Sequence, residues 1–435
     1  MKLRDDEKAM LDGAQGPAVS KAMDLLVRYG EALGAECLID TNNVAGTIGA
    51  TTPFLRQYGD RNGGMDAVFS EFNLDSAEVV PIPRVKVFSS HLQQGIDPKH
   101  AARQGVSEDV VRIYERGQAY SSGLGVQPLN TCTPYQVGNV PVKGEHCAWM
   151  ESSAVIYINS VLGARTNAEG RESTGAAMLT GKIPYWGLHI DDNRRGTHLI
   201  QLDIDVSSTA DWGLLGYWMC EQVQDRIPVI EGLRPQPNLA RLKHFGAAAA
   251  SSGGVEMYHL VGVTPEARTR EEAFGGREIE SVMRFGEAER RWAYEQVNIT
   301  ARDAQVDFVM LGCPHYSLEQ IWEVCQLLEG QRLSANTELW IFTAASIKQL
   351  ADQAGYTRTI EAAGGHLMTD TCSAIGRVIP KGTQVAAVDS AKQAHYLPAI
   401  MGIQTWFGTT ADCVQAAVEA VSYTHLRAHE TSLHL

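Results

Sequence analysis

Residues 306–328, VDFVMLGCPHYSLEQIWEVCQLL, contain the pattern that decides the fold. An apolar run of strand length is followed by turn-forming residues and then by a stretch with the apolar spacing of a helix. Further strand-like runs occur at 338–344 and 366–370, and the segments 384–400 and 403–421 each fit a strand followed by a helix. Repeated strand–helix units predict an α/β fold, with a mostly parallel sheet covered by helices.

This arrangement places chemically useful side chains at one edge of the predicted sheet. Cys313, Cys372 and the group Asp389–Ser390–Lys392 each fall just past the carboxyl end of a predicted strand. Ligands of open α/β sheets bind at this edge. We therefore expect a functional site there.

The N-terminal part of the chain has a less regular pattern. Residues 17–33 predict an amphipathic helix with Pro17 at its first position. Residues 36–46 predict a short strand that runs into a loop at Asn42, Asn43 and Gly46. A strand at 79–90 and a helix at 107–120 precede a long loop-like tract, 121–149, which is rich in Gly, Pro, Thr and Asn. A loop of this length in a compact domain is usually functional.

Composition excludes several functional classes. The 435 residues are 44% hydrophobic and 20% charged, as in soluble globular proteins, and the formal net charge is -14. An acidic chain is a poor partner for nucleic acid or an anionic membrane. The N-terminus is charged and lacks an apolar leader, and no apolar run is long enough to span a bilayer. We therefore expect a cytoplasmic protein with reduced cysteines.

The eight cysteines fall into two groups. Four lie in apolar, helix-like stretches and are expected to be small buried hydrophobes: Cys37, Cys220, Cys325 and Cys413. The other four lie near loop signals: Cys132, Cys147, Cys313 and Cys372. Of these, Cys132, Cys313 and Cys372 stand beside turn-forming or hydroxyl-bearing residues. Three thiolates can hold an iron–sulfur cluster and leave one iron open, although three unrelated buried cysteines would give the same spacing.

A second group of polar residues lies at 143–154, KGEHCAWMESSA. Its Lys, His, Glu and Ser side chains could bind a carboxylate or move a proton, or they could form an ordinary capped turn. The segment 159–173, with Arg165, Asn167 and Arg171, offers a further anion-binding loop. The sequence contains no P-loop, HExxH, GxSxG or CxxC motif.

The run TCTPYQVGNVPVKGEHCAWMESSAVIYINSVLGARTNAEG, residues 131–170, closely resembles the signature region of the aconitase X family. The opening helix, FNLDSAE (72–78), LGCPHYSLEQI (311–321), HLMTDTC (366–372) and DSAKQAHYLP (389–398) occur in the order expected of that family. The resemblance therefore covers residues 1–421. It implies an aconitase-like, multi-domain α/β/α fold, which we divide into an N-terminal part, about 1–295, and a doubly wound C-terminal part, about 296–421.

The resemblance implies an iron–sulfur-dependent hydro-lyase that dehydrates a small hydroxy acid. Carried over position by position, the cluster ligands are Cys132, Cys313 and Cys372. Our candidates for proton transfer are Lys143, His146 and Glu151, although the base could instead be a serine of a small domain. The candidates for substrate binding are Asn73, Ser152, Ser153, Arg165, Asn167, Ser390 and Lys392. Family members dehydrate cis-3-hydroxy-L-proline in bacteria, our preferred substrate, or mevalonate 5-phosphate in archaea.

Aconitase-type enzymes also use a small swivelling domain, for which the family-like residues 1–421 leave no room. Either a separate small subunit binds this chain, or the gene was cut where the tail at 422–435 begins; we expect the separate subunit. Residues 422–435, SYTHLRAHETSLHL, have no periodicity and resemble translated vector sequence, so we exclude them from the fold. Two other classes of function stay open: a cysteine-nucleophile enzyme that uses Cys313 with His315, and a non-catalytic scaffold with structural zinc.

Overall fold

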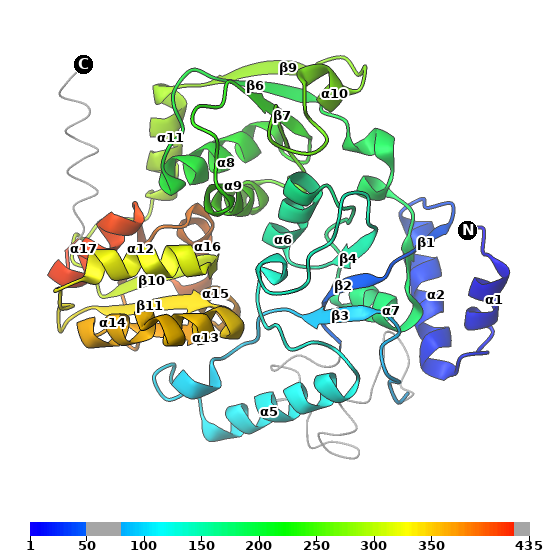
Figure 1. Cartoon of the computed structure of the whole chain (residues 1–435), viewed down its shortest axis with the longest axis horizontal. Helices are drawn as coiled ribbons and strands as arrows, with labels where there is room; N and C mark the ends of the chain where they lie inside the picture. The colour runs from blue at the N-terminus through cyan, green and yellow to red at the C-terminus, as the bar shows by residue number, and fades with distance from the viewer. Residues whose placement is uncertain (49–79, 422–435) are drawn as a thin grey trace. The chain divides into compact units, whose positions relative to one another are not determined.

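The computed structural model describes residues 1–48 and 80–421, which form two compact units (Figure 1). Unit 1 comprises the described parts of residues 1–92, together with residues 106–129 and 134–195. Unit 2 comprises residues 93–105, residues 130–133 and the chain from Gly196 onward. The predictions for Asn73 and for the tail at 422–435 lie outside the described residues.

Unit 1 contains two small sheets. One has the parallel strand order β3-β2-β4, and the other is the antiparallel pair β1-β5. Its strands are β1 (Leu38–Asp40), β2 (Asn43–Gly46), β3 (Phe88–His91), β4 (Cys147–Trp149) and β5 (Lys182–Pro184). Its helices are α1 (Asp5–Leu11), α2 (Pro17–Ala32), α5 (Glu108–Gly123), η2 (Pro134–Gln136), α6 (Ser152–Tyr157), η3 (Ile158–Leu162), α7 (Arg171–Thr180), η4 (Gly187–His189) and η5 (Asp191–Arg194).

Two of the predictions for unit 1 need correction. The helix at 17–33 is present as α2, but the loop predicted at Asn42–Gly46 is largely strand β2. Gly46 belongs in this strand because helix α7 packs against it: a Cβ atom there would lie 2.3 Å from Thr174 Oγ1. The long tract at 121–149 also contains structure, since it ends in strand β4.

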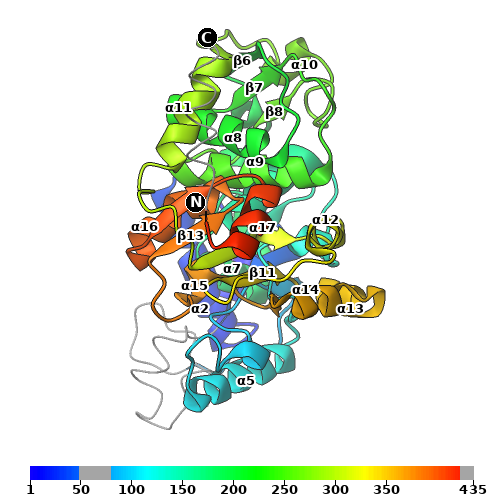
Figure 2. The same ribbon diagram turned by 90° about the vertical axis from the view of Figure 1, so that its left-hand side faces the viewer.

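The first sheet of unit 2 has four parallel strands in the order β8-β7-β6-β9. They are β6 (His198–Leu202), β7 (Pro228–Glu231), β8 (His259–Leu260) and β9 (Ser281–Phe285). The associated helices are α8 (Thr209–Val223), α9 (Leu239–Ser252), α10 (Arg270–Phe274) and α11 (Glu287–Val297). Figure 2 shows α8 and α9 next to strands β6 and β7. Helix α8 is buried around most of its circumference, and α9 packs along it.

The second sheet of unit 2 has five parallel strands in the order β12-β11-β10-β13-β14. They are β10 (Phe308–Tyr316), β11 (Glu338–Thr343), β12 (His366–Thr369), β13 (Val385–Val388) and β14 (Gln404–Phe407). The helices are η1 (Pro98–His100), α12 (Leu318–Leu328), α13 (Ala345–Ala354), α14 (Tyr356–Ala363), α15 (Ser373–Gly376), α16 (Ala391–Met401) and α17 (Thr410–Glu419).

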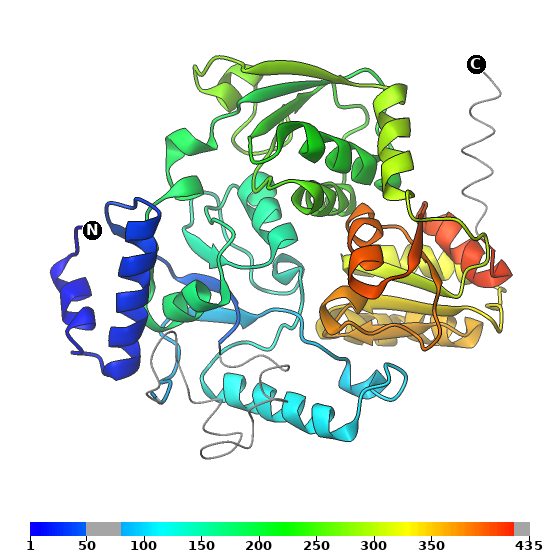
Figure 3. The ribbon, with the colours of Figure 1, turned by 180° about the vertical axis from the view of Figure 1, so that it is seen from behind.

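Helices cover both faces of this sheet. Helices α12, α14 and α17 pack together, while α16 packs against β13 and β14 and also against α8 and α9. Figures 1 and 3 show the sheet from the two sides, with α12 nearer the viewer in the first and α16 in the second. Strand β10 is buried along its whole length, as expected for the centre of a parallel sheet. The α/β fold predicted from the sequence is thus confirmed.

The strand order locates the functional edge of the sheet. Successive strands run outward from β10 through β11 to β12 on one side, and from β13 to β14 on the other. The order therefore reverses between β10 and β13, and ligands of such sheets bind beyond the carboxyl ends of the strands at this reversal.

The single helix predicted at 346–365 is instead two helices. Gly355, with a positive φ of 81°, separates α13 from α14.

Candidate functional site

Cys313 lies at the carboxyl end of β10, beside the reversal of strand order. The pairing of β10 with β11 is irregular between Leu311 and Tyr316, so Cys313 lies within a bulge of the strand and not beyond its end as predicted. Gly312 makes this bulge possible. Its φ is +96°, and a Cβ atom at this position would lie 2.2 Å from the carbonyl oxygen of Phe342.

The other two cysteines also follow unusual backbone. As predicted, Cys372 comes just after the end of β12, where it occupies the N-cap position of helix α15. Cys132 lies in the segment 130–133 of unit 2. In each case the residue two positions earlier, Asp370 or Asn130, has a positive φ, of 67° and 46° respectively. Non-glycine residues adopt this conformation at a cost and are enriched at functional sites.

His315 connects the three cysteine-bearing segments. Its backbone N–H donates to Cys132 Sγ at 3.3 Å, its Nδ1 lies 2.8 Å from Thr131 Oγ1, and its Nε2 lies 2.9 Å from the carbonyl oxygen of Thr371. Because a carbonyl can only accept, Nε2 carries a proton, and in the neutral ring Nδ1 accepts from the Thr131 hydroxyl. Segments that are far apart in the sequence are therefore joined through one buried residue.

The same contacts weaken the cysteine-nucleophile hypothesis. A nucleophilic cysteine needs a histidine with a ring nitrogen free to accept its proton. Both ring nitrogens of His315 already have partners, Thr131 and Thr371. His315 is therefore a structural link between the cysteine segments, and it does not activate Cys313.

A buried lysine that the sequence did not reveal stands next to this group. Lys243 in α9 is 2% exposed and donates to the carbonyl oxygen of His315 at 2.7 Å and to Gln320 Oε1 at 2.6 Å. Burial lowers its pKa to about 7, while the nearby charges of Cys132, Asp389 and Cys313 act to raise it. One feature of the sequence could have indicated this residue: the polar pair Lys243–His244 lies within a mostly apolar, alanine-rich stretch.

The thiols themselves are almost fully buried, with exposed fractions of 7% for Cys132, 8% for Cys313 and 7% for Cys372. Across residues 1–48 and 80–421, no three His, Cys, Asp or Glu side chains form a group able to hold a single metal ion. The role of these cysteines as cluster ligands therefore stays a prediction. The cysteines expected to be simple core residues are buried in three cases, and Cys37 is partly exposed.

The predicted group at the end of β13 is close to this site in the fold. Ser390 is 3% exposed and caps helix α16 by accepting from the backbone N–H of Gln393 at 3.3 Å. Lys392 lies in the first turn of α16 and is half-buried. Asp389 accepts hydrogen bonds from Tyr316 and, at 2.8 Å, from Thr410, and burial raises its pKa.

In unit 1, several predicted residues have structural partners. Glu151 caps helix α6 and accepts from the Ser153 hydroxyl at 2.9 Å, with Ser152 at the first position of the helix. Asn167 accepts from the Leu188 N–H at 2.8 Å and donates to the Trp186 carbonyl at 3.2 Å. These contacts give Glu151, Ser153 and Asn167 a structural role that does not depend on a bound substrate.

His146 is the predicted proton-transfer residue with the most suggestive surroundings. Its Nδ1 lies 3.0 Å from Nδ1 of His189, a fully buried residue for which no sequence pattern suggested a role. Arg165 forms an ion pair with Asp191 and donates to the His189 carbonyl at 3.1 Å. Burial, with Arg165 and Arg194 nearby, lowers the pKa of His146, so its ring is neutral at pH 7. Lys143, by contrast, is exposed.

Comparison with known proteins identifies the family. Models described as the first, second and third domains of aconitase X match residues 1–192, 196–295 and 306–419. The chain belongs to the aconitase X family. The crystal structure of Thermococcus kodakaraensis aconitase X (holo-form) has a TM-score of 0.79 to this chain, with 29% identity, covering 96% of this chain and 100% of that one.

Characterised aconitase X relatives are dehydratases. The phosphomevalonate dehydratase large subunit of Methanocaldococcus jannaschii is 36% identical, over 94% of this chain and 98% of that protein. The cis-3-hydroxy-L-proline dehydratase of Pseudomonas aeruginosa is 34% identical, over 95% of this chain and 69% of that protein. This aconitase X chain is therefore a hydro-lyase. None of its described helices combines the length and apolar character needed to cross a bilayer.

Proposed function

We propose that this chain is the large subunit of a two-subunit, iron–sulfur-dependent dehydratase of a small hydroxy acid. The observation that supports the proposal most directly is the connection of Cys132, Cys313 and Cys372 within unit 2. Their segments meet at His315, although Cys132 is separated from the other two by more than a third of the chain. Two of the three thiols also follow a non-glycine residue with a positive φ, a conformation that is enriched at functional sites.

The residues present are suited to a cluster. Thiolates are the usual ligands of iron–sulfur clusters, and an N–H donor to a ligand sulfur, as from His315 to Cys132, stabilises its negative charge. The buried ammonium of Lys243 provides a counter-charge. Thiolates that bind different irons of a cluster stand farther apart than ligands of one ion, so a cluster does not require a single-ion geometry.

Dehydration requires removal of a proton next to the substrate carboxylate and departure of hydroxide. A bound iron–sulfur cluster would supply a Lewis-acidic iron to assist the departing hydroxyl. In unit 2, Ser390 and Lys392 are our candidates for holding substrate oxygens at the carboxyl edge of the sheet. In unit 1, neutral His146, oriented by His189, is our candidate for moving a proton. Arg165 is the candidate for carboxylate binding, while the capping role of Glu151 makes it the weaker candidate for proton transfer.

The partner is a small subunit. Relatives from Methanocaldococcus jannaschii and Methanothermobacter thermautotrophicus carry the name large subunit, and this chain covers 98% and 94% of their lengths. The relative from Pseudomonas aeruginosa is longer, since this chain covers 69% of it. A separate small protein that completes the active site is consistent with both observations.

Two substrates are candidates. Mevalonate 5-phosphate ranks first, because the relatives named for it reach 36% and 37% identity. The cis-3-hydroxy-L-proline favoured by the sequence ranks second, because the relatives named for it reach 33% and 34%. Both are small hydroxy acids, so the two proposals share the same chemistry of water removal.

The test combines iron content with turnover. Chain purified without oxygen should be brown and contain iron and sulfide, and Cys132→Ser, Cys313→Ser and Cys372→Ser should each lose most of both. Cys325→Ser, at a buried thiol in another part of the core, should retain them. With the small subunit added, the iron-loaded chain should dehydrate one of the two substrates. Bound zinc without iron would instead support a structural scaffold, and turnover of neither substrate would refute the assigned substrate class.

A further inference from the structure

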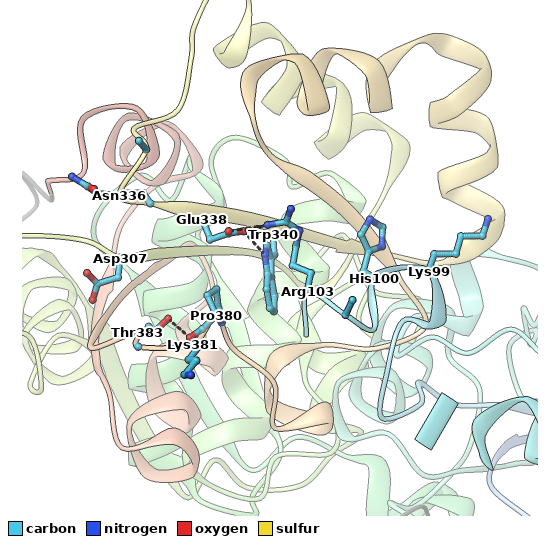
Figure 4. Close-up of a pocket in the computed structure, with 14 residues that line it drawn as sticks. Lys99, His100, Arg103, Asp307, Asn336, Glu338, Trp340, Pro380, Lys381 and Thr383 are labelled. Atoms are coloured by element: carbon cyan, nitrogen blue, oxygen red, sulfur yellow. Dashed lines mark hydrogen bonds and ion pairs between the residues drawn. The ribbon is translucent and has the colours of Figure 1, made fainter. Parts of the chain in front are cut away.

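A large polar cavity lies at the opposite edge of the five-stranded sheet from the cysteines. Its volume is about 740 Å³, within the range of small-molecule sites. It is formed where β10, β11 and β13 begin, together with the segment 98–103 and the loop 380–383. Figure 4 shows Arg103, Glu338 and Trp340 in the middle of the cavity, with Lys99 and His100 on one side and Lys381 on the other.

The two acidic groups in this cavity already have hydrogen-bond partners. Arg103 Nη1 donates to both carboxylate oxygens of Glu338, at 2.8 and 3.0 Å, and the Trp340 indole N–H donates to the same carboxylate at 3.0 Å. Asp307 accepts from the backbone N–H groups of Gln384 and Val385, at 2.8 and 3.0 Å. Glu338 is thus paired with the cation of Arg103, whereas Asp307 keeps its negative charge.

The two lysines of the cavity have fewer polar contacts than its carboxylates. Within residues 1–48 and 80–421, no hydrogen bond or ion pair engages the ammonium of Lys381, and that of Lys99 has only an electrostatic interaction with Asp352. Lys99, Arg103 and Lys381 together carry one more charge than Glu338 and Asp307. This positive cavity stands out in a chain with a formal net charge of -14.

One wall of the cavity is connected to the loop that carries Cys372. Asp97, 1% exposed, accepts from the Lys99 N–H at 2.8 Å and lies 2.7 Å from His100 Nδ1. The same carboxylate accepts from the backbone N–H of Thr369, the last residue of β12, at 2.9 Å. Three residues further along the chain is Cys372. A ligand that restricts the motion of Lys99 and His100 would therefore also stabilise the loop that carries Cys372.

We propose that the cavity is a second binding site, for a small polyanion that carries phosphate or carboxylate groups, and that its occupancy stabilises the Cys372 loop. Lys381 and Lys99 bind the anion from opposite sides, and Arg103 contributes from the centre. The significance of the loop for catalysis rests on the proposed function. The binding itself does not, because no cavity residue is among the candidate catalytic or ligand residues.

Calorimetry on the full chain at low ionic strength tests the binding, with pyrophosphate and citrate as separate probes. We expect one site per chain for at least one of them, and an affinity reduced tenfold or more by Lys381→Gln or Lys99→Gln. Lys86→Gln removes the same charge from an exposed position in unit 1 and should change the affinity less than twofold. No binding of either probe, or equal weakening by the control, would overturn the proposal. A preference for one probe identifies the ligand as phosphate-bearing or carboxylate-bearing.

Hydrogen exchange of the metal-free chain tests the connection to the loop. A saturating probe should slow exchange in peptides covering 366–376 in the wild-type chain and leave them unchanged in Lys381→Gln. Binding without such protection would refute the stabilisation of the loop. The measurement requires neither iron nor turnover, so its failure and failure of the proposed dehydratase function can be told apart.

Discussion

Replacing Lys243 with methionine tests whether this buried charge serves stability or the cysteine site. Methionine is similar in length but cannot donate to the carbonyl oxygen of His315 or to Gln320 Oε1. The drop in the lysine pKa from 10.5 to about 7 corresponds to about 5 kcal/mol against the charged form in the folded chain. Two hydrogen bonds to a charged donor contribute about 3–6 kcal/mol in the other direction. The two effects nearly cancel, so the free energy of unfolding should change by no more than about 2 kcal/mol.

The thiols should respond much more strongly. The N–H of His315 lies 3.3 Å from Cys132 Sγ, and its C=O lies 2.7 Å from Lys243 Nζ. Because both groups belong to one residue, the sulfur and the ammonium are at most roughly 10 Å apart. A cation at that distance favours a thiolate by about 1.5 kcal/mol at an effective dielectric constant near 20, which is roughly tenfold. Since the thiolate is the reactive form, Lys243→Met should slow alkylation of Cys132 by about tenfold.

The assay is the rate of iodoacetamide labelling in the metal-free chain, followed by mass spectrometry at each cysteine, together with urea unfolding. Lys243→Arg keeps the charge and is the matched control, and buried Cys220 is the internal reference. Unchanged labelling of Cys132, or an equal change at Cys220, would refute the electrostatic argument. The iron-loaded Lys243→Met chain should also release iron faster than the wild-type chain.

Two further substitutions probe the backbone and the charges around the site. Gly312→Ala should lower the free energy of unfolding by about 3 kcal/mol or more, because its Cβ would lie 2.2 Å from the Phe342 carbonyl oxygen. Gly330→Ala is the control: its φ is also positive but no atom lies within 4 Å, so it should cost only about 1–2 kcal/mol. Equal losses for the two variants in urea unfolding would contradict this. Burial alone would raise the pKa of Asp97, but hydrogen bonds from His100 and the Thr369 N–H leave it lowered. A lowered carboxyl pKa stabilises the fold above the unfolded-state value near 3.9, and this stability is lost as the pH falls below it. Melting temperatures between pH 6 and 3 should therefore fall more steeply for the wild-type chain than for Asp97→Asn, and parallel curves would count against the argument.

Local sequence patterns were enough to predict most strands and helices of the C-terminal sheet. The apolar runs at 308–311, 339–342 and 385–388 became strands, because a short continuous apolar run bounded by turn-forming residues is typical of a buried strand. The strand–helix alternation then required parallel pairing, and parallel pairing brought Cys313 and Ser390 to one edge of the sheet. The residues at 131–170 were also sufficient, by their resemblance alone, to indicate the family.

Which distant residues meet could not be predicted from local patterns and became visible only in the folded chain. The segment 130–133 belongs to unit 2 while its neighbours on both sides belong to unit 1, a division that no local periodicity encodes. Lys243 lies 72 residues from the carbonyl it contacts, and His189 lies 43 residues from His146. Such pairs depend on how whole elements pack, because the free energy of a long-range contact comes from burial shared by many residues. For the same reason Gly312 looked like an ordinary turn residue until the carbonyl of Phe342, on the neighbouring strand, left no space for a side chain.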